Sequence, residues 1–181
     1  AVADKPFLSL DERVRGLVDV ADLSDELAEK TTISIPASAY LQDTDGSESL
    51  WFRLTAQATD GSSQALSEFT LTGVSGGYFD NIHNAYFVSA LELSDLLVSR
   101  PAEHGAFDGV FTVDAVSIEG LASGATAQDA AAWVYDPSSP STSWAASSGQ
   151  LTVEFLQPAA VPTVTMSQVT YKTLADTSHV L

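Results

Sequence analysis

Short runs in which apolar and polar residues alternate recur along the whole 181-residue chain. A period of two places alternate side chains on opposite faces of a half-buried strand. The runs are separated by turns rich in Gly, Ser, Asp and Pro, which are typical strand boundaries. They begin at Ile33 and continue at residues 50–56, 69–72, 111–115 and 151–155. Short strands at fairly regular spacing predict an all-β chain folded as a β-sandwich.

Helical signals are few. Residues 19–30 predict a short amphipathic helix with Ser24 as a possible N-cap, and residues 91–98 predict a single turn. Residues 55–67 and 120–149 are expected to be loop extensions of the sandwich. The second extension contains Trp133, Tyr135 and Trp144. A loop of that length is usually functional or disordered, and disordered segments are poor in aromatic residues.

An acidic turn lies between two strand-like runs and reads Asp-Thr-Asp-Gly-Ser-Glu-Ser-Leu from Asp43 to Leu50. Ca²⁺ takes about six to eight oxygen ligands, so alternating oxygen-bearing side chains around a Gly turn suit it. We therefore expect calcium at Asp43, Asp45, Ser47 and Glu48. The alternative is a plain Asx turn, whose carboxylates accept hydrogen bonds from backbone N–H groups.

Composition excludes several function classes. The formal charge is −17, which disfavours nucleic acid and anionic membranes as partners, although acidity also simply keeps a protein soluble. The chain has no cysteine, and its three histidines are too scattered for a zinc site. No apolar run reaches the roughly 18 residues of a membrane span, so no membrane insertion is expected. No catalytic signature motif is present, so we do not expect an enzyme.

Several motifs, in this order, resemble the tandem Ig-like or cadherin-like repeats of giant bacterial RTX adhesins exported by type I secretion. The opening Ala-Val-Ala-Asp-Lys-Pro-Phe-Leu is similar to the linker between those repeats. Thr70-Leu71-Thr72-Gly73-Val74 is similar to a family strand, with Ser75 in place of the usual proline. The other matching segments are residues 29–35, the acidic turn and residues 93–111.

The resemblance implies an Ig-like or cadherin-like antiparallel β-sandwich from an extracellular, Ca²⁺-dependent protein of the bacterial cell surface. Residues 1–28 would be an inter-repeat linker and leading segment, and residues 29–157 the calcium-binding sandwich. Residues 158–181 would be a second linker with the start of a following repeat or a final strand. The implied partners are neighbouring repeats of the same polypeptide, and the domain itself is expected to be a monomer.

A strand from Thr31 to Gln42 would span roughly 40 Å, which would put Glu29 and Asp43 at opposite poles. In the adhesin repeats calcium binds at domain junctions. Asp4 would then serve the leading junction, and Asp43, Asp45 and Glu48 the trailing one. Ala160 stands where the second linker would carry Asp, which leaves a local site as the alternative.

Two roles remain open for such a module. In the first it binds a peptide or glycan, with Trp133, Tyr135 and Trp144 as contacts. Asp80, Asn81, Asn84 and Asp108 would complete a calcium site with open positions, although each aspartate also suits a turn. In the second role the chain is a passive extender, and the aromatic residues only fold their loop onto the sandwich. A concave aromatic and acidic pocket at residues 120–149 would favour binding, and a flat surface would favour the extender.

Overall fold

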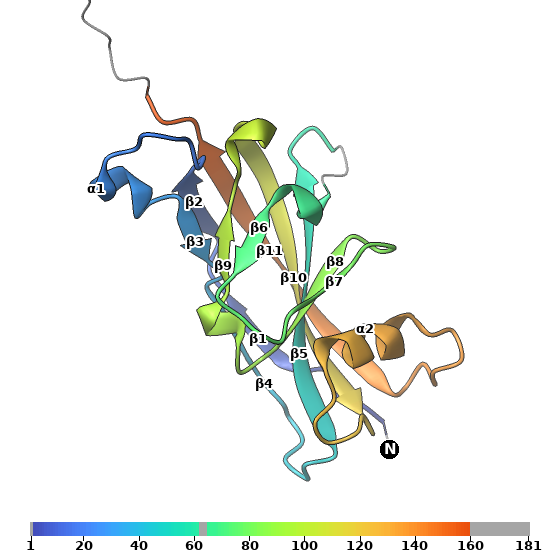
Figure 1. Cartoon of the computed structure of the whole chain (residues 1–181). Coiled ribbons are helices and arrows are strands. Elements are labelled where there is room, and N and C mark those ends of the chain that lie inside the picture. The colour runs from blue at the N-terminus through green and yellow to red at the C-terminus, as the bar shows by residue number, and fades with distance from the viewer. Residues whose placement is uncertain (1, 62–64, 160–181) are drawn as a thin grey trace, which may run out of the picture.

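A computed structural model describes residues 2–61 and 65–159, and Figure 1 shows how its elements are arranged. Its strands are β1 (Phe7–Leu10), β2 (Arg13–Leu17), β3 (Thr32–Ser34), β4 (Ala37–Tyr40), β5 (Glu48–Ala58), β6 (Thr70–Thr72), β7 (Tyr78–Asp80), β8 (Ala85–Ser89), β9 (Leu97–Ser99), β10 (Phe107–Glu119) and β11 (Trp144–Leu156). The helices are α1 (Asp25–Ala28), α2 (Ala127–Tyr135) and the 3-10 turns η1 (Leu66–Glu68), η2 (Leu93–Asp95) and η3 (Ala102–His104).

The strands form two layers. One layer is a six-stranded sheet in the order β2-β11-β10-β5-β8-β7. The other consists of a three-stranded sheet, β3-β9-β6, and a two-stranded sheet, β1-β4. The predicted all-β sandwich with a few short helical turns is confirmed. Its strands are not all antiparallel, however, because β2 runs parallel to β11.

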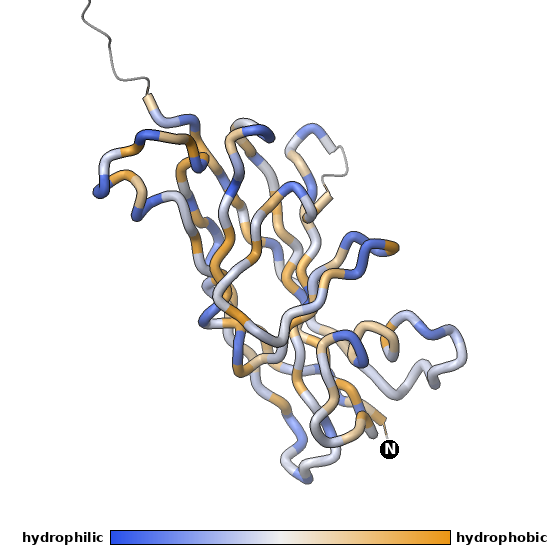
Figure 2. Tube along the Cα trace, in the orientation of Figure 1, coloured by the Kyte–Doolittle hydropathy of each residue, from blue (hydrophilic) through white to orange (hydrophobic). Residues whose placement is uncertain are grey.

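The main core lies between the two layers. The alternation in β10 directs Phe111 and Val113 into it, and both are fully buried. Phe69 packs edge-to-face against the rings of Phe107 and Phe111, with ring centroids 5.0 and 5.2 Å apart. Aromatic pairs prefer this geometry because the positive ring edge meets the negative ring face. Figure 2 shows apolar stretches following the strands, while the loops beyond them are mostly polar.

A second, smaller core covers one end of the outer face of the six-stranded sheet. Helix α2 presents a stripe of buried residues, Ala127, Ala130, Ala131 and Val134, at the spacing of one helix face. They pack with Trp51 of β5, Phe87 of β8, and Val116 and Ile118 of β10. Both faces of the sheet are therefore buried at this end.

Helix α2 corrects the expectation of an irregular loop over residues 120–149. Thr126 and Asp129 form a reciprocal capping box at its first turn, and β11 already begins at Trp144. The alanine-rich stretch has no strong period, but alanine is the best helix former. The other expected extension, 55–67, is also partly strand, because β5 continues to Ala58.

The first 28 residues are not a separate linker. Strand β1 pairs with β4, and β2 pairs with β11, so both strands belong to the sandwich. The expected strand from Thr31 to Gln42 is broken near Pro36, where the chain passes from β3 in one sheet to β4 in another. Proline lacks an N–H donor, which suits this break. The expected following repeat or final strand lies almost entirely outside the described residues.

Both segments predicted to be helical contain a helical turn, and each turn is shorter than the predicted range. Ser24 is the N-cap of α1, but its side chain makes no capping hydrogen bond. Within residues 91–98 the turn η2 forms, as expected. Among the described residues, no helix is both long enough and apolar enough to cross a membrane.

Candidate functional site

The acidic turn between β4 and β5 consists of two successive Asx turns. The N–H of Asp45 donates to Oδ1 of Asp43 over 3.0 Å, and the N–H of Ser47 donates to Oδ1 of Asp45 over 2.8 Å. Gly46 has a φ of 83°, a left-handed conformation that suits glycine. Hydrogen bonds from the hydroxyl and the N–H of Ser47 lower the pKa of Asp45. The turn is therefore anionic at neutral pH and holds its shape through its own side chains.

Glu48 and Glu119 lie directly opposite one another at the ends of β5 and β10. Like charges at opposed cross-strand positions destabilise a sheet. The Ser47 hydroxyl lies 2.9 Å from Oε2 of Glu119 and 2.6 Å from Oδ1 of Asp45. A hydroxyl has one hydrogen to donate, so it can satisfy only one of these carboxylates at a time.

The carboxylate of Glu48 is only half satisfied. Its Oε1 accepts the N–H of Asp4 over 2.7 Å, whereas Oε2 is buried and has no partner. Burial raises the pKa of Glu48, and the nearby charges of Asp4, Glu119 and Asp43 raise it further, although the Asp4 N–H opposes them. The charges of three other carboxylates therefore act on Glu48 at this end of the sandwich.

The N-terminal segment is fastened to the same end. Ala3 donates its N–H to the carbonyl of Thr142 over 2.8 Å, and the Ser117 hydroxyl donates to the carbonyl of Asp4 over 2.5 Å. In Figure 1 the described chain enters at this pole and leaves at the opposite one. The expectation that Asp4 and the acidic turn serve different junctions is therefore wrong. The folding of β1 back along β4 brings both to the leading pole.

These carboxylates do not form a preformed cage. Within residues 2–61 and 65–159, no group of three or more His, Cys, Asp or Glu side chains is arranged to hold a metal ion. Calcium coordination there would need side-chain rotation, together with backbone carbonyls or water as further ligands.

Asp80 closes the hairpin between β7 and β8. Its Oδ1 accepts the N–H groups of Ile82 and His83, and its Oδ2 lies 2.8 Å from Nδ1 of His83. Burial raises the pKa of Asp80, but the hydrogen bonds from His83 and Ile82 outweigh it and hold that pKa below its usual value. Both of its oxygens are thus engaged within the turn. Asn81 and Asn84 are exposed on the same hairpin, and Asn84 has a φ of 50°.

The structure does not bring Asp108 to this hairpin. Phe79, the neighbour of Asp80, lies opposite Tyr86 of β8. Tyr86 lies opposite Leu54 of β5, and Leu54 lies opposite Val113 of β10. Asp108 is at the start of β10, roughly 13–16 Å further along that strand. The two aspartates cannot share an ion in this arrangement. The carbonyl of Asp108 instead accepts hydrogen bonds from Thr59.

Tyr135 and Trp144 lie over the outer face of the six-stranded sheet. Tyr135 stacks on His83 with ring centroids 3.6 Å apart. The guanidinium of Arg53 lies 5.8 Å from the Tyr135 ring and 5.9 Å from the Trp144 ring. Arg53 also donates to the buried carboxylate of Asp114 over 2.8 Å. These two aromatic residues therefore cover a buried ion pair.

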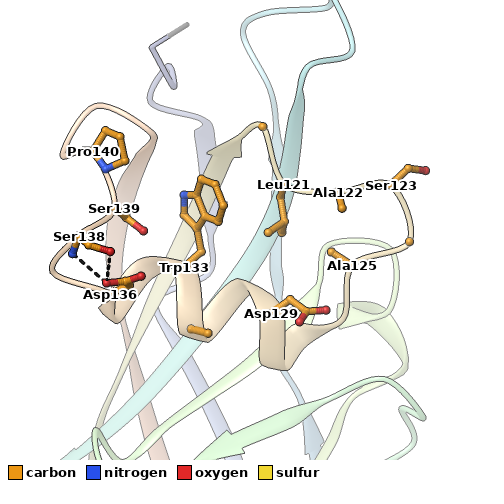
Figure 3. A pocket seen from close by; sticks show the side chains of 13 residues that line it. Leu121, Ala122, Ser123, Ala125, Asp129, Trp133, Asp136, Ser138, Ser139 and Pro140 are labelled. Atoms are coloured by element: carbon orange, nitrogen blue, oxygen red, sulfur yellow. Dashed lines mark hydrogen bonds between the residues drawn. The ribbon is translucent and has the colours of Figure 1, made fainter.

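Trp133 is separated from the other two aromatic residues and lines a cleft of about 760 Å³ (Figure 3). The cleft lies between the loop that follows β10 and the loop that follows α2. Asp129 and Asp136 line it together with Ser138 and Ser139. The indole N–H of Trp133 donates to the buried hydroxyl of Ser143 over 3.0 Å. Residues 120–149 thus form a concave, partly exposed pocket that is both aromatic and acidic.

Sequence reasoning missed Glu119, Arg53 and Asp129. Glu119 becomes relevant only through its register with Glu48, which lies 71 positions away in the sequence. Arg53 lies in a recognisable strand, but its pairing with Asp114 again depends on register. Asp129 had a local signal, since Thr126 three residues before it completes the capping box.

Comparison of the chain with protein-family models, with curated proteins and with solved structures found no match.

Proposed function

We propose that this chain is a Ca²⁺-dependent module of a large bacterial surface adhesin that binds a peptide or glycan on a partner cell or surface. The observation that carries the calcium part is the opposition of Glu48 and Glu119, with one oxygen of Glu48 buried and unpartnered. In the described part of the chain, neither glutamate forms a salt bridge with a basic side chain. A bound cation would relieve both their repulsion and the unsatisfied oxygen.

The chemistry of the donors favours calcium over softer metals. All candidate ligands at this pole are oxygens, from carboxylates, the Ser47 hydroxyl and backbone carbonyls. Calcium accepts six to eight such ligands in a flexible geometry, whereas zinc prefers nitrogen and sulfur. The Asx hydrogen bonds occupy Oδ1 of Asp43 and of Asp45, so the acidic turn is partly ordered before any ion binds.

The position of this cluster suits a role in stiffening a fibre. Asp4 belongs to the segment through which the chain enters the sandwich, and its N–H already contacts Glu48. An ion held between this segment and the ends of β5 and β10 would restrict rotation of whatever precedes Asp4. We propose neighbouring repeats of the same polypeptide as that partner, at the bacterial cell surface and outside the cell.

The cleft beside Trp133 supports binding over passive extension. A passive extender needs no concave surface on the insertion between β10 and β11, and a flat packing of the helix would have sufficed. The passive extender remains the second candidate, favoured by the clamped N-terminal segment. The two roles share the calcium cluster and differ only in the use of the cleft.

Thermal unfolding in millimolar CaCl₂ and in excess EGTA tests the calcium part. We expect EGTA to lower the melting temperature by several degrees, because saturation at 100 times the Kd contributes about 2.7 kcal/mol. Asp45→Ala should reproduce part of the loss, since it removes the carboxylate that orders Ser47. Magnesium at the same concentration is the control for ionic strength. Superimposable curves in calcium and EGTA would refute the proposal.

A further inference from the structure

Helix α2 has an unusual outer face. Its inner stripe packs on the sheet, as described above, while Asp129, Ala132, Trp133 and Asp136 all line the cleft. Residues spaced by three and four positions lie next to one another on a helix surface. Trp133 lies between Asp129 and the C-cap residue Asp136. It is half-buried and also packs against the second core, so only part of its ring faces the cleft.

The indole of Trp133 is held in a fixed position. Its N–H donates to the Ser143 hydroxyl, and that hydroxyl lies 2.7 Å from the carbonyl of Pro140. Ser143 is itself 6% exposed, so this anchor is shielded from water. The ring therefore stands in the cleft between Leu121 on one side and Pro140 on the other (Figure 3). A ring fixed before binding loses little conformational entropy when a ligand contacts it.

The two aspartates are also oriented by local hydrogen bonds. Oδ2 of Asp129 accepts the N–H and the hydroxyl of Thr126, and Oδ1 of Asp136 accepts the N–H and the hydroxyl of Ser138. The backbone N–H of Thr126 lowers the pKa of Asp129, and the Ser138 hydroxyl lowers that of Asp136, so both are ionised at neutral pH. The second oxygen of each has no donor among the described residues. The described lining of the cleft contains no Lys, Arg or His.

We propose that this cleft binds a cationic side chain, lysine or arginine, presented by a protein partner. An ammonium or guanidinium group over the face of tryptophan is attracted by the ring quadrupole. The free oxygen of Asp136 can accept its hydrogen bond, and the charge strengthens that bond. Asp129 lies about 10 Å away along the helix axis, so it adds negative charge to the cleft and does not bind the same cation directly. This inference deepens the proposed binding role and rests on it, and it selects a peptide over a glycan.

The charge of the cleft is the reason for that choice. Two carboxylates with no neighbouring base leave an uncompensated negative field, which a cation neutralises and a neutral sugar does not. The whole chain carries 24 acidic and 7 basic residues, so the same field extends beyond the cleft and favours the approach of a basic segment. The volume of about 760 Å³ leaves room for the backbone on either side of the bound side chain.

The test uses the full 181-residue chain labelled with ¹⁵N and follows the indole N–H resonance of Trp133 by NMR. The probe is acetyl-Gly-Lys-Gly-amide, and the matched control is acetyl-Gly-norleucine-Gly-amide, which keeps the alkyl chain and lacks the charge. Trp133→Phe assigns the resonance. We expect a saturable shift with the lysine peptide and none with the norleucine peptide.

Two variants separate the cleft from the general acidity of the chain. Asp136→Asn keeps an oxygen that can accept the Ser138 hydrogen bonds and removes only the charge, so it should fold normally. It should weaken lysine-peptide binding roughly two- to fivefold, the range for a solvent-accessible ion pair. Glu103→Gln makes the same change in net charge on the exposed turn η3, at the other end of β10. It should leave the affinity unchanged.

Equal effects of the two variants, or equal shifts with the two peptides, would overturn the inference. A saturable shift with a neutral oligosaccharide such as maltotriose, and none with the lysine peptide, would also overturn it and would leave a glycan-binding module. If no probe moves the Trp133 resonance, the cleft assignment fails. The calcium-dependent melting temperature then decides independently whether the proposed module stands.

Discussion

Replacing Glu119 by glutamine should have opposite effects on stability with and without calcium. In the calcium-free protein, Glu119 faces Glu48 across the β5–β10 pair, and both carry like charges. Opposed like charges cost about 0.2–1 kcal/mol of sheet stability, so Glu119→Gln should stabilise the calcium-free protein by about that much. The glutamine keeps a side-chain oxygen that can accept the Ser47 hydroxyl, which limits the change to the charge.

With calcium bound, the Glu119 carboxylate becomes a ligand of the ion. Saturation at 100 times the Kd contributes about 2.7 kcal/mol, and most of it should be lost without the Glu119 carboxylate. For a domain of this size, 1 kcal/mol corresponds to about 2–4 °C in Tm. We therefore expect Glu119→Gln to raise Tm by up to about 4 °C in EGTA and, after subtracting the relieved repulsion, to lower it by roughly 3–10 °C in calcium.

Differential scanning calorimetry of the wild type and Glu119→Gln in the two buffers measures this reversal of sign. Glu103→Gln, which removes an exposed charge far from the cluster, should show no reversal. A Glu119→Gln variant that shifts Tm in the same direction in both buffers would refute the argument that a cation neutralises this pair.

Three further predictions concern stability. Arg53→Met leaves the buried Asp114 carboxylate without its cation, so urea denaturation should show a loss of about 3 kcal/mol in the free energy of unfolding. The double variant with Asp114→Leu should recover most of that loss. If it does not, the loss comes from the missing contacts between Arg53 and the rings of Tyr135 and Trp144. Gly109→Ala places a Cβ 2.3 Å from the Gln57 carbonyl oxygen, so the same assay should show a loss of roughly 2 kcal/mol, and wild-type stability would contradict the close approach. The folded pKa of Glu48 is raised above its ordinary 4.5, so its contribution to stability in EGTA is complete below pH 4.5 and is lost as pH rises through the folded value. Glu48→Gln should flatten this part of the pH profile measured by thermal unfolding, and an unchanged slope would contradict the raised pKa.

The strands with a clear alternation were the predictable part of the fold. Phe111, Val113 and their neighbours alternate with a period of two because one face of β10 meets the main core. The same period was obscured towards Ile118, where α2 buries the other face as well. Residues buried on both faces lose the alternation, and single-sequence patterns then cannot separate a strand from a helix.

The insertion between β10 and β11 shows a second limit. Its alanines carry helix propensity, but they lack the large apolar side chains that make a helical stripe visible in the sequence. Small residues are needed there because α2 packs closely on the sheet beside Trp51 and Phe87. Propensity is a weak signal that tertiary packing often overrides, and here packing decides the outcome.

The candidate site was predictable only where its residues are local. The acidic turn could be found from its own sequence, and so could the turn-forming role of Asp80. Its opposition to Glu119 and its contact with Asp4 depend on strand register and on how β1 folds back. These are long-range pairings, and one sequence contains no direct signal for them.

A crystal structure grown in millimolar calcium is the most direct test of the proposed metal site. We expect an ion at the pole where the chain enters the sandwich, bound by Glu48 and Glu119 at about 2.3–2.6 Å and completed by oxygens of the acidic turn or of Asp4. An electron-density map with water at this pole, and the two glutamates still facing each other without a cation, would contradict it.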